Sequence, residues 1–427
     1  MLAGTILRGK AETLHQTFTI RRLLTLLGFL NSRHPASDPN PERQRSGVFL
    51  AGCLASEEPH FADARGSDQT GGEPMRLSLI CGLLLLTGCG ESTRINGGGA
   101  SFIYPIMLHW SRVYDREFQV EIDYQSTGSG NGIQQTIART IQFGCTDAPI
   151  KNEQLDRARG INGEIIHIPL AMGGVVPIYN LPEATEPLRL NGSILANIFL
   201  GKITFWDDAE LQTMNPEVAL PHREIVVARR SDSSGTTAIF TDYLSQANAE
   251  WKEKVKSGTT VKWPVGVGQR GNEGVAGMVS RSPYSIGYVE LIYAIQNKLA
   301  YGAVETRDSE IATKKASRPL KDRTFLLATL ETVTAAADAK FAEIPEDLRY
   351  SLVFTKGENS YPIAGTNWAV LYVKQPASNG PQLVEFLRWA TRYDGDAQRN
   401  AKEMGYAPLP RALCERCEKR LNLVTFE

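Results

Sequence analysis

The sequence lacks an excess of charge of either sign. Its 427 residues carry 46 lysines and arginines against 47 aspartates and glutamates, which leaves a formal net charge of −1. A protein that binds nucleic acid or an anionic membrane through its general surface needs a clear basic excess or a basic stripe. The overall charge therefore gives no reason to expect either partner, and any site for an anion must be local.

Cysteine and histidine are also scarce. Six cysteines are too few for a disulfide scaffold, and the six histidines show neither the His-x-x-x-His spacing of a helical zinc site nor a nearby cysteine pair. Cys414 and Cys417 have the C-x-x-C spacing of redox and metal sites, but no second pair accompanies them. We therefore expect an incidental pair or a local disulfide there, and neither a metal nor another cofactor.

Long apolar runs are missing as well. The run from Leu77 to Leu86 in "MRLSLICGLLLLTGCGES" is half of the roughly 20 residues that a membrane-crossing helix needs. It follows a positive residue, Arg76, and precedes small residues and Cys89, which is the order of parts in a secretory signal. Residues 75–88 are therefore predicted to be a signal peptide that starts at an internal methionine.

Residues 1–74 differ in character from the rest of the chain. Their segments "NSRHPASDPNPERQRSGVF" and "ASEEPHFADARGSDQTGGEP" have no apolar period and are rich in proline, glycine, serine and charge. We predict that they are disordered and that translation begins at Met75. The stretch "RRLLTLLGFL" from Arg21 to Leu30 is a weaker rival export signal.

The end of the signal, Leu86-Thr87-Gly88-Cys89, resembles the lipobox of bacterial lipoproteins, in which the cysteine is lipidated and becomes the first residue of the mature chain. The similar string Leu50-Ala51-Gly52-Cys53 follows a charged, proline-containing segment that cannot supply an apolar core, so we interpret it as a coincidence. Cys89 is the predicted lipidation site, the lipid is the expected membrane contact, and residues 89–95 are predicted to be a polar tether.

The remaining sequence alternates helical and strand-like patterns. A helix is predicted to begin near Phe102, and "VEIDYQS" over Val120–Ser126 predicts a strand that "TGSGNG" links to a second helix, "IQQTIARTI". Further along, "EIIHIPLAMGGVVPIYN" and "EIVVARR" predict buried strands, and "TTAIFTDYLSQANAEWKEKV" predicts one long helix. This order predicts an α/β protein with mixed, mostly parallel sheets flanked by helices, in which ligands sit at the carboxyl ends of strands.

Three predicted strand-to-helix loops consist of small and hydroxyl residues: "GGGASF" at 97–102, "TGSGNG" at 127–132 and "RRSDSSGTT" at 229–237. Helix amino ends expose unpaired N–H groups and the positive end of the helix dipole, so each loop is a candidate anion-binding site. A helix cap with a flexible turn explains any single loop better, but three in one chain favour an anion site. The sequence has no G-x-x-x-x-G-K-[ST] and no G-x-S-x-G, the motifs of nucleotide P-loops and serine hydrolases.

Several strings, taken in order, carry a family resemblance: "GASF", "YQSTGSGNGIQQ", "FGCTDAPI", "FLGKITFWDD", "NPEVALP", "RRSDSSGTTAIFTDYL", "VKWPVGVGQRGNEGVAGMV" and "SIGYVEL". From about Gly98 to Pro410 the chain resembles the phosphate-binding proteins of the bacterial high-affinity phosphate ABC transporter. The resemblance implies a two-lobed type II periplasmic binding protein with a ligand cleft between the lobes. We place the lobes at residues 96–172 with 360–427 and at 173–359.

The resemblance further implies a monomeric binding protein without enzymatic activity. Such a protein binds one inorganic phosphate ion in the periplasm or at the cell surface and delivers it to the permease subunits of the ABC transporter. Two alternatives stay open at this point. One is a phosphate-ester hydrolase on the same fold, which needs a metal set or an activated nucleophile. The other is a binder of another tetrahedral oxyanion, such as sulfate, molybdate or phosphonate.

The resemblance also places phosphate-binding residues on the three loops and on one strand end. They are Ser101, Phe102 through its backbone N–H, Ser129, Asp147, Arg230, Ser234, Gly235 and Thr236. Asp232 is implied to hold the Arg230 guanidinium, and Cys145 is expected to fill a small buried position. Ser101 stands where relatives often carry threonine, and Ser233 stands where they often carry glycine.

Asp147 is the residue expected to select the ligand. A carboxylate only accepts hydrogen bonds, so it repels an oxyanion that has no proton to donate. Phosphate keeps at least one P–OH group near neutral pH, whereas sulfate has none. Asp147 is therefore expected to reject sulfate in a closed, dry site.

Overall fold

The computed structural model describes residues 93–427. The predicted upstream extension at 1–74, the signal peptide at 75–88 and the lipidation site at Cys89 lie outside the described residues. Within the described range, no helix combines the length and the apolar character that crossing a membrane requires.

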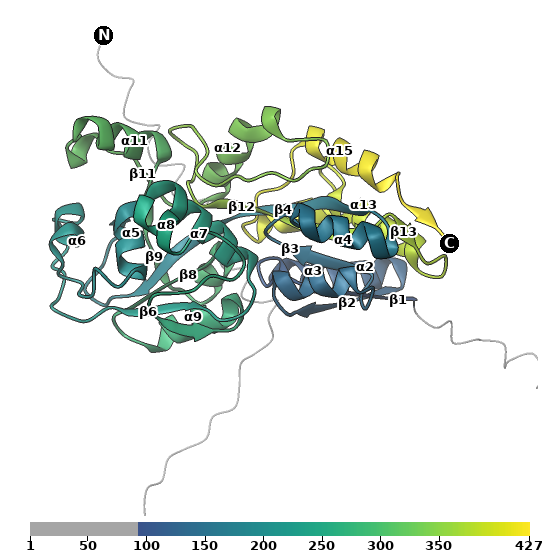
Figure 1. Ribbon diagram of the computed structural model, residues 1–427, viewed down its shortest axis with the longest axis horizontal. Helices are drawn as coiled ribbons and strands as arrows, with labels where there is room; N and C mark the ends of the chain where they lie inside the picture. Colours follow the sequence, from purple (N-terminus) through teal and green to yellow (C-terminus); the bar gives the residue numbers. More distant parts are fainter. Residues whose placement is uncertain (1–92) are drawn as a thin grey trace, which may run out of the picture. The chain divides into compact units, whose positions relative to one another are not determined.

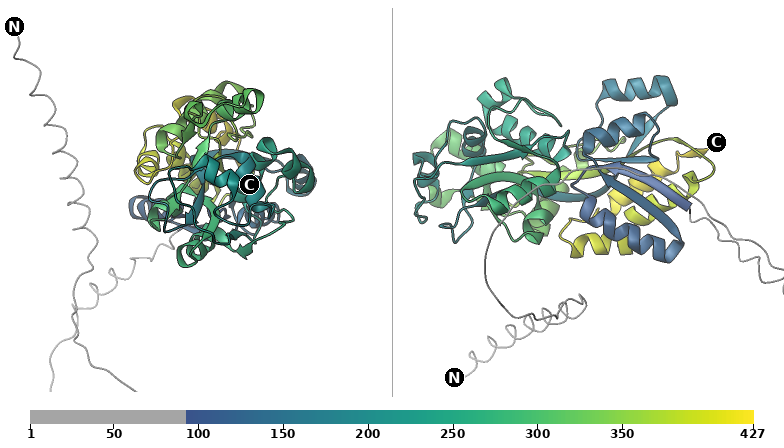
Figure 2. Two further views of the ribbon diagram at one scale, coloured as in Figure 1. Left: turned by 90° about the vertical axis from the view of Figure 1, so that its left-hand side faces the viewer. Right: turned by 90° about the horizontal axis from the view of Figure 1, so that it is seen from below.

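A mixed sheet organises this part of the chain, with the strand order β2-β1-β3-β12-β4-β8-β6-β7 and with β9 (Ala300–Tyr301) paired to β4. At one end the strands β1 (Thr93–Gly99), β2 (Val120–Ser126) and β3 (Phe143–Thr146) run parallel. The helices of this half are α2 (Tyr104–Phe118), α3 (Ser129–Ile137), α4 (Asn152–Asn162), α13 (Gly380–Thr391), α14 (Asp396–Glu403) and α15 (Arg411–Leu421). The first and last described segments lie side by side, because α13 and α14 pack against β1 and α2 (Figures 1 and 2).

The other half of the sheet contains β6 (Val226–Arg230), β7 (Val267–Gln269) and β8 (Ser285–Glu290), and β6 runs parallel to both β7 and β8. Its helices include α5 (Gly192–Phe199), α6 (Ala209–Met214), α7 (Gly235–Ala247), α8 (Ala249–Lys254), α9 (Gly271–Arg281) and α10 (Leu291–Gln296). A small sheet joins β5 (Arg189–Leu190), β10 (Ala303–Glu305) and β11 (Phe325–Leu326), and the helices α11 (Arg307–Ala316) and α12 (Leu330–Lys340) follow β10 and β11.

One long strand, β4 (Ile165–Asn180), belongs to both halves. It pairs antiparallel with β12 (Ala364–Tyr372) from Ile165 to Gly174 and with β8 from Val175 to Asn180. All of its residues except the last are buried, which explains its nearly unbroken apolar sequence. The change of partner within β4 separates the two halves of the sheet, in keeping with the two-lobed fold that the family resemblance implies.

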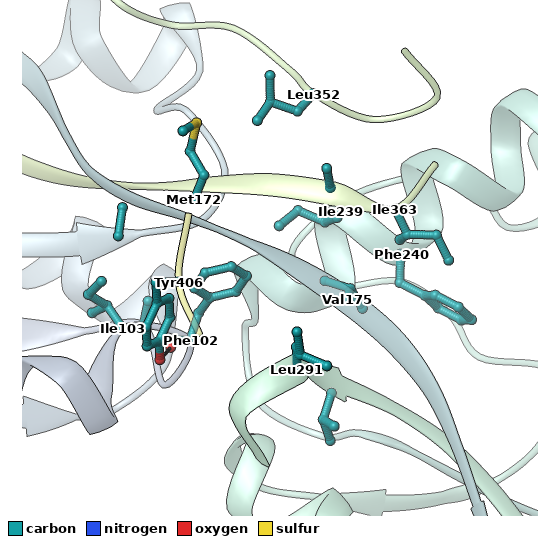
Figure 3. Close-up of a cluster of buried hydrophobic side chains, with 14 of the residues drawn as sticks. Phe102, Ile103, Met172, Val175, Ile239, Phe240, Leu291, Leu352, Ile363 and Tyr406 are labelled. Carbon is teal, nitrogen blue, oxygen red and sulfur yellow. Dashed lines mark hydrogen bonds between the residues drawn. The ribbon is translucent and has the colours of Figure 1, made fainter. Parts of the chain in front are cut away.

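Apolar side chains from both lobes pack around β4 where its partner changes. Figure 3 shows Met172 and Val175 of β4 in one cluster with Phe102, Ile363 and Leu291. Each of these side chains is nearly or completely buried. Because burying a large apolar side chain contributes about 1.5–3 kcal/mol, this cluster fixes the loop after β1 against the strand that joins the lobes.

The last residues of the predicted polar tether, 93–95, are not a free linker. They belong to β1, which begins at Thr93. β1 pairs with β2 on one side and with β3 on the other. A side chain at Gly97 would lie 2.2 Å from the Phe143 ring, and one at Gly99 would lie 2.2 Å from the carbonyl oxygen of Cys145. The glycines of this segment therefore permit close strand packing rather than a flexible entry.

Two predicted helix boundaries are also wrong. Helix α3 begins at Ser129, so the last four residues of "TGSGNG" form its first turn, and Gly128 precedes it with a φ of +93°. The helix predicted over 236–255 is interrupted, because α7 ends at Ala247 and α8 begins at Ala249. Asn248 between them has extended backbone angles and caps α8 by accepting a hydrogen bond from the N–H of Trp251.

Candidate anion-binding site

The predicted site residues come together where β1, β3 and β6 end and where α3, α7 and α9 begin. Their polar side chains are almost completely buried: Ser101, Ser129, Asp147, Arg230, Ser234 and Thr236 are each at most 3% exposed. Helix amino ends carry free N–H groups and a partial positive charge, so their convergence brings hydrogen-bond donors to this buried region.

Ser129 connects the loops of the two lobes. Its Oγ accepts hydrogen bonds from the N–H of Gly235, at 3.0 Å, and from the N–H of Asp147, at 3.3 Å. A hydroxyl has two lone pairs, so both are occupied and the Ser129 proton is left to donate, either to Oδ2 of Asp147 at 3.4 Å or to an anion. Ser234 caps α7 in a similar way, because its Oγ accepts from the N–H of Thr237 at 3.1 Å.

Arg230, at the end of β6, is held by Asp232 as the resemblance implies. Its Nε donates to Oδ1 of Asp232 at 2.7 Å, and its Nη2 donates to Oδ2. Burial alone would raise the pKa of Asp232, but the bonds from Arg230 and from the N–H of Gly271 lower it. The third guanidinium nitrogen, Nη1, is buried and has no hydrogen-bond partner among residues 93–427.

Asp147 supplies the acceptor in this group of donors. Burial raises the pKa of its carboxyl to about 7, although hydrogen bonds from Asn367 and Ser129 and the charge of Arg230 oppose the rise. Asn367 donates to Oδ1 at 2.7 Å, which leaves Oδ2 next to Ser129. The carboxyl is therefore oriented by one oxygen and presents the other to the site.

The two lobes touch directly at the site. A side chain at Gly235 would lie 2.5 Å from Cβ of Asp147 and 2.6 Å from Oγ of Ser129, so only glycine fits between them. The N–H of Gly130 donates to the carbonyl oxygen of Ser233 at 3.0 Å. A side chain at Gly130 would lie 2.0 Å from Oγ of Ser233, so the absence of a side chain at Gly130 makes room for the side chain of Ser233.

A cavity of about 280 Å³ lies beside the buried site and reaches Asp147. Lys151 and Thr366 line it from one side, and Ile239 and Asp242 of α7 line it from the other. Asp147 therefore lines this cavity although the residue is only 3% exposed.

The side chain of Phe102 lies in the core and not in the site. It is fully buried in the cluster around β4, and its carbonyl oxygen accepts a hydrogen bond from the hydroxyl of Tyr406 at 2.8 Å. This position leaves Phe102 only its backbone as a group that could contact a ligand, and the predicted contact through its backbone N–H stays a prediction.

The cysteines in the described range are free thiols. Cys145 is completely buried beside the site, as predicted, and Cys414 and Cys417 face the core from α15 without a disulfide between them. Burial raises the pKa of the Cys414 thiol to about 11, which disfavours the reactive thiolate. Residues 93–427 contain no group of three or more His, Cys, Asp or Glu side chains that could hold a metal ion.

Two asparagines at the site were missed by the sequence analysis. Asn272, in the first turn of α9, contacts the hydroxyls of Ser101 and Thr236, and Asn367 orients Asp147 from β12. The string "GQRGNEG" at 268–274, which runs from the end of β7 into the start of α9, is a fourth glycine-containing junction between a strand and a helix and could have identified Asn272. Asn367 has no comparable signal beyond being a polar residue in a buried strand.

Comparison with known proteins identifies the family of this chain. The PBP superfamily domain model matches residues 66–393. The phosphate-binding protein PstS of Xylella fastidiosa (strain Temecula1 / ATCC 700964) is 41% identical over 332 residues, which are 77% of this chain and 85% of the relative. The phosphate-binding protein PstS of Pasteurella multocida (strain Pm70) is 37% identical over 346 residues, which are 81% of this chain and 94% of the relative.

A solved structure shows the same fold. It is a high-affinity periplasmic phosphate-binding protein (PfluDING) with bound phosphate, and it matches with a TM-score of 0.62 at 18% identity over 77% of this chain and 93% of that chain. Fold and site together define a two-lobed member of the PBP superfamily with a buried, donor-rich centre. Within that superfamily, the chain belongs to the PstS family of phosphate-binding proteins.

Proposed function

We infer that this protein binds inorganic phosphate for import by an ABC transporter and performs no chemistry on it. The observation that carries this inference is the free Nη1 of Arg230, which is buried without a protein partner among the described residues. A buried guanidinium N–H without an acceptor is costly, and an anion oxygen is the partner that would remove this cost.

The surrounding groups fit a tetrahedral oxyanion that still carries a proton. The hydroxyls of Ser101, Ser129 and Thr236 and the N–H groups at the start of α7 are donors, and they need no basic excess in the chain as a whole. Asp147 is the acceptor that a P–OH group would use. We propose that these residues, with Phe102, Arg230, Ser234 and Gly235, form the phosphate site and that Asp232 orients Arg230.

We further propose that the two lobes comprise residues 96–172 with 360–427 and residues 173–359, and that they close over the ion as a monomer. The partner change of β4 between Gly174 and Val175 supports the boundary near residue 172. Delivery to permease subunits and anchoring through a lipid on Cys89, in the periplasm or at the cell surface, belong to the same proposal. The mass of the natural protein's first peptide tests the anchor, because a lipidated Cys89 must then be its first residue.

Calorimetric titration of phosphate-stripped, folded protein with phosphate and then with sulfate, at equal ionic strength, tests the ligand. We expect tight binding of phosphate at one site per chain and no measurable binding of sulfate. Absence of phosphate binding would overturn the proposed function. Release of product from a chromogenic phosphate ester would instead favour a hydrolase.

A further inference from the structure

Asn272 makes four hydrogen bonds inside the site and is completely buried. Its Nδ2 donates to Oγ of Ser101 at 3.0 Å and to Oγ1 of Thr236 at 3.1 Å, and its backbone N–H donates to Oγ of Ser101 at 3.1 Å. Its Oδ1 accepts from the N–H of Glu290 at 3.1 Å. A backbone N–H can only donate, so this last bond fixes which end of the amide faces the two hydroxyls.

These bonds determine the direction in which the two hydroxyls point their protons. A hydroxyl oxygen has two lone pairs and one proton. Both lone pairs of Ser101 Oγ accept N–H groups of Asn272, so its proton must be donated to another atom. Thr236 Oγ1 accepts one hydrogen bond from Asn272, which occupies one of its two lone pairs and leaves its proton to be donated elsewhere.

The arrangement spans the two lobes. Ser101 follows β1 in the first lobe, whereas Thr236 lies at the start of α7 and Asn272 at the start of α9 in the second. Ser101 can therefore receive both N–H groups only when the lobes are in contact. Closure of the lobes and orientation of the donors are then the same event.

We propose that Asn272 is a positioning residue of the anion site, which turns the hydroxyl of Ser101 into an obligatory hydrogen-bond donor and favours donation by the hydroxyl of Thr236 when the lobes close. The proposal rests on the proposed function, since it explains how that site becomes selective for a ligand rich in acceptor oxygens. A merely space-filling Asn272 would need only its bond to Glu290.

The variant Asn272→Asp tests the proposal. It keeps the shape of the side chain and the oxygen that accepts from the backbone N–H of Glu290, but it replaces Nδ2 with an oxygen. An ionised Asp at this position accepts the protons of Ser101 and Thr236 and turns them away from the ligand. We expect phosphate binding at pH 9 to weaken by about 100-fold or more relative to the wild type at the same pH. The ratio of the wild-type affinity to the variant affinity should fall toward 1 as the pH approaches 6, because a protonated carboxyl can donate one hydrogen bond again.

Asn215→Asp is the matched control. Asn215 is 3% exposed, and its Nδ2 donates to the carbonyl oxygens of Arg189 and Leu211. The same chemical change there should lower the thermal midpoint but leave the phosphate affinity and its pH profile unchanged. Circular dichroism of each variant establishes that it is folded.

A double-mutant cycle gives a second readout that does not depend on the Asp side chain. If Asn272 acts through Ser101, then Asn272→Ala and Ser101→Ala together should weaken phosphate binding by less than the product of their separate effects. Independent, multiplicative effects in the cycle, or an Asn272→Asp affinity ratio that stays constant from pH 9 to pH 6, would overturn the proposal. A wild-type protein that binds no phosphate would show that the proposed function itself had failed.

Discussion

Asn367 donates a hydrogen bond from its side-chain amide to Oδ1 of Asp147 over 2.7 Å. Asn367 is fully buried in β12, and the register of β12 against β4 shifts between Asn367 and Trp368. An irregularity of this kind changes the direction of the neighbouring side chains. The strand that packs beside the lobe-joining strand therefore also sets which oxygen of Asp147 faces the site.

Replacing Asn367 by leucine should shift the pH range in which the protein distinguishes phosphate from sulfate. The bond from Asn367 lowers the pKa of Asp147, so its loss should move that pKa further above 7. A protonated Asp147 can donate to sulfate instead of repelling it. Titrations at pH 7 should show the preference for phosphate reduced about tenfold, with recovery above pH 9. An unchanged preference at pH 7 would argue that Asn367 has no influence on Asp147.

Asp147→Asn should relax the rejection of sulfate, and most strongly above pH 7, where the wild-type carboxyl is ionised. The amide removes the negative charge that faces an anion oxygen and adds a donor in its place. Like charges in a closed site cost several kcal/mol, so sulfate affinity should rise by roughly 100-fold or more. Competition of sulfate against labelled phosphate measures the change. The idea fails if the variant binds phosphate more weakly while sulfate remains excluded.

Asp147 should also make the phosphate-free protein less stable as the pH rises. Its pKa is about 7 in the folded protein, against about 3.9 for an unfolded aspartate. Between these values the folded state binds more protons than the unfolded state, so stability falls with rising pH over this window and then levels off. The free energy of unfolding should fall by at most about 4 kcal/mol over this window. Urea unfolding at pH 4, 5.5 and 7.5 should show that the stability of Asp147→Asn increases relative to that of the wild type as the pH rises.

Gly235→Ala should prevent closure without unfolding the protein. The added methyl group would meet Asp147 and Ser129 of the opposite lobe within 2.6 Å. Phosphate affinity should drop by about 100-fold or more, because a site that cannot close stays wet and its donors stay misplaced. Gly160→Ala on α4 is the matched control, since nothing lies within 4 Å of its added carbon. Normal phosphate binding by Gly235→Ala would contradict the closed geometry described above.

The sequence was sufficient wherever a pattern is local. β2 follows its alternating pattern from Val120 to Ser126, and β4 follows its unbroken apolar run. β1 was not recognisable, because its polar and glycine residues become buried only through the strands on both sides of it. The break between α7 and α8 was not predicted, because it depends on Asn248 alone and a single asparagine can also stand inside a continuous helix.

The residues of the site also divide into those that the sequence identifies and those that it does not. The loops that carry Ser101, Ser129 and Ser234 were identified from composition and from the family resemblance, and the fold brings them together. Asn272 and Asn367 escaped notice because each is one polar residue far from those loops in sequence. Only the strand pairing and the helix packing show that their amides reach the site.

The single strand β4 has a consequence for how amide protons exchange with solvent. Because β4 passes uninterrupted from β12 to β8, the lobes can separate by twisting this strand while its ladder of hydrogen bonds stays intact. The N–H groups of Gly130, Gly235 and Asn272 instead donate to the opposite lobe and are released whenever the lobes part. Deuterium uptake at these amides should therefore follow the opening rate and slow when phosphate is added, while uptake along β4 stays slow throughout.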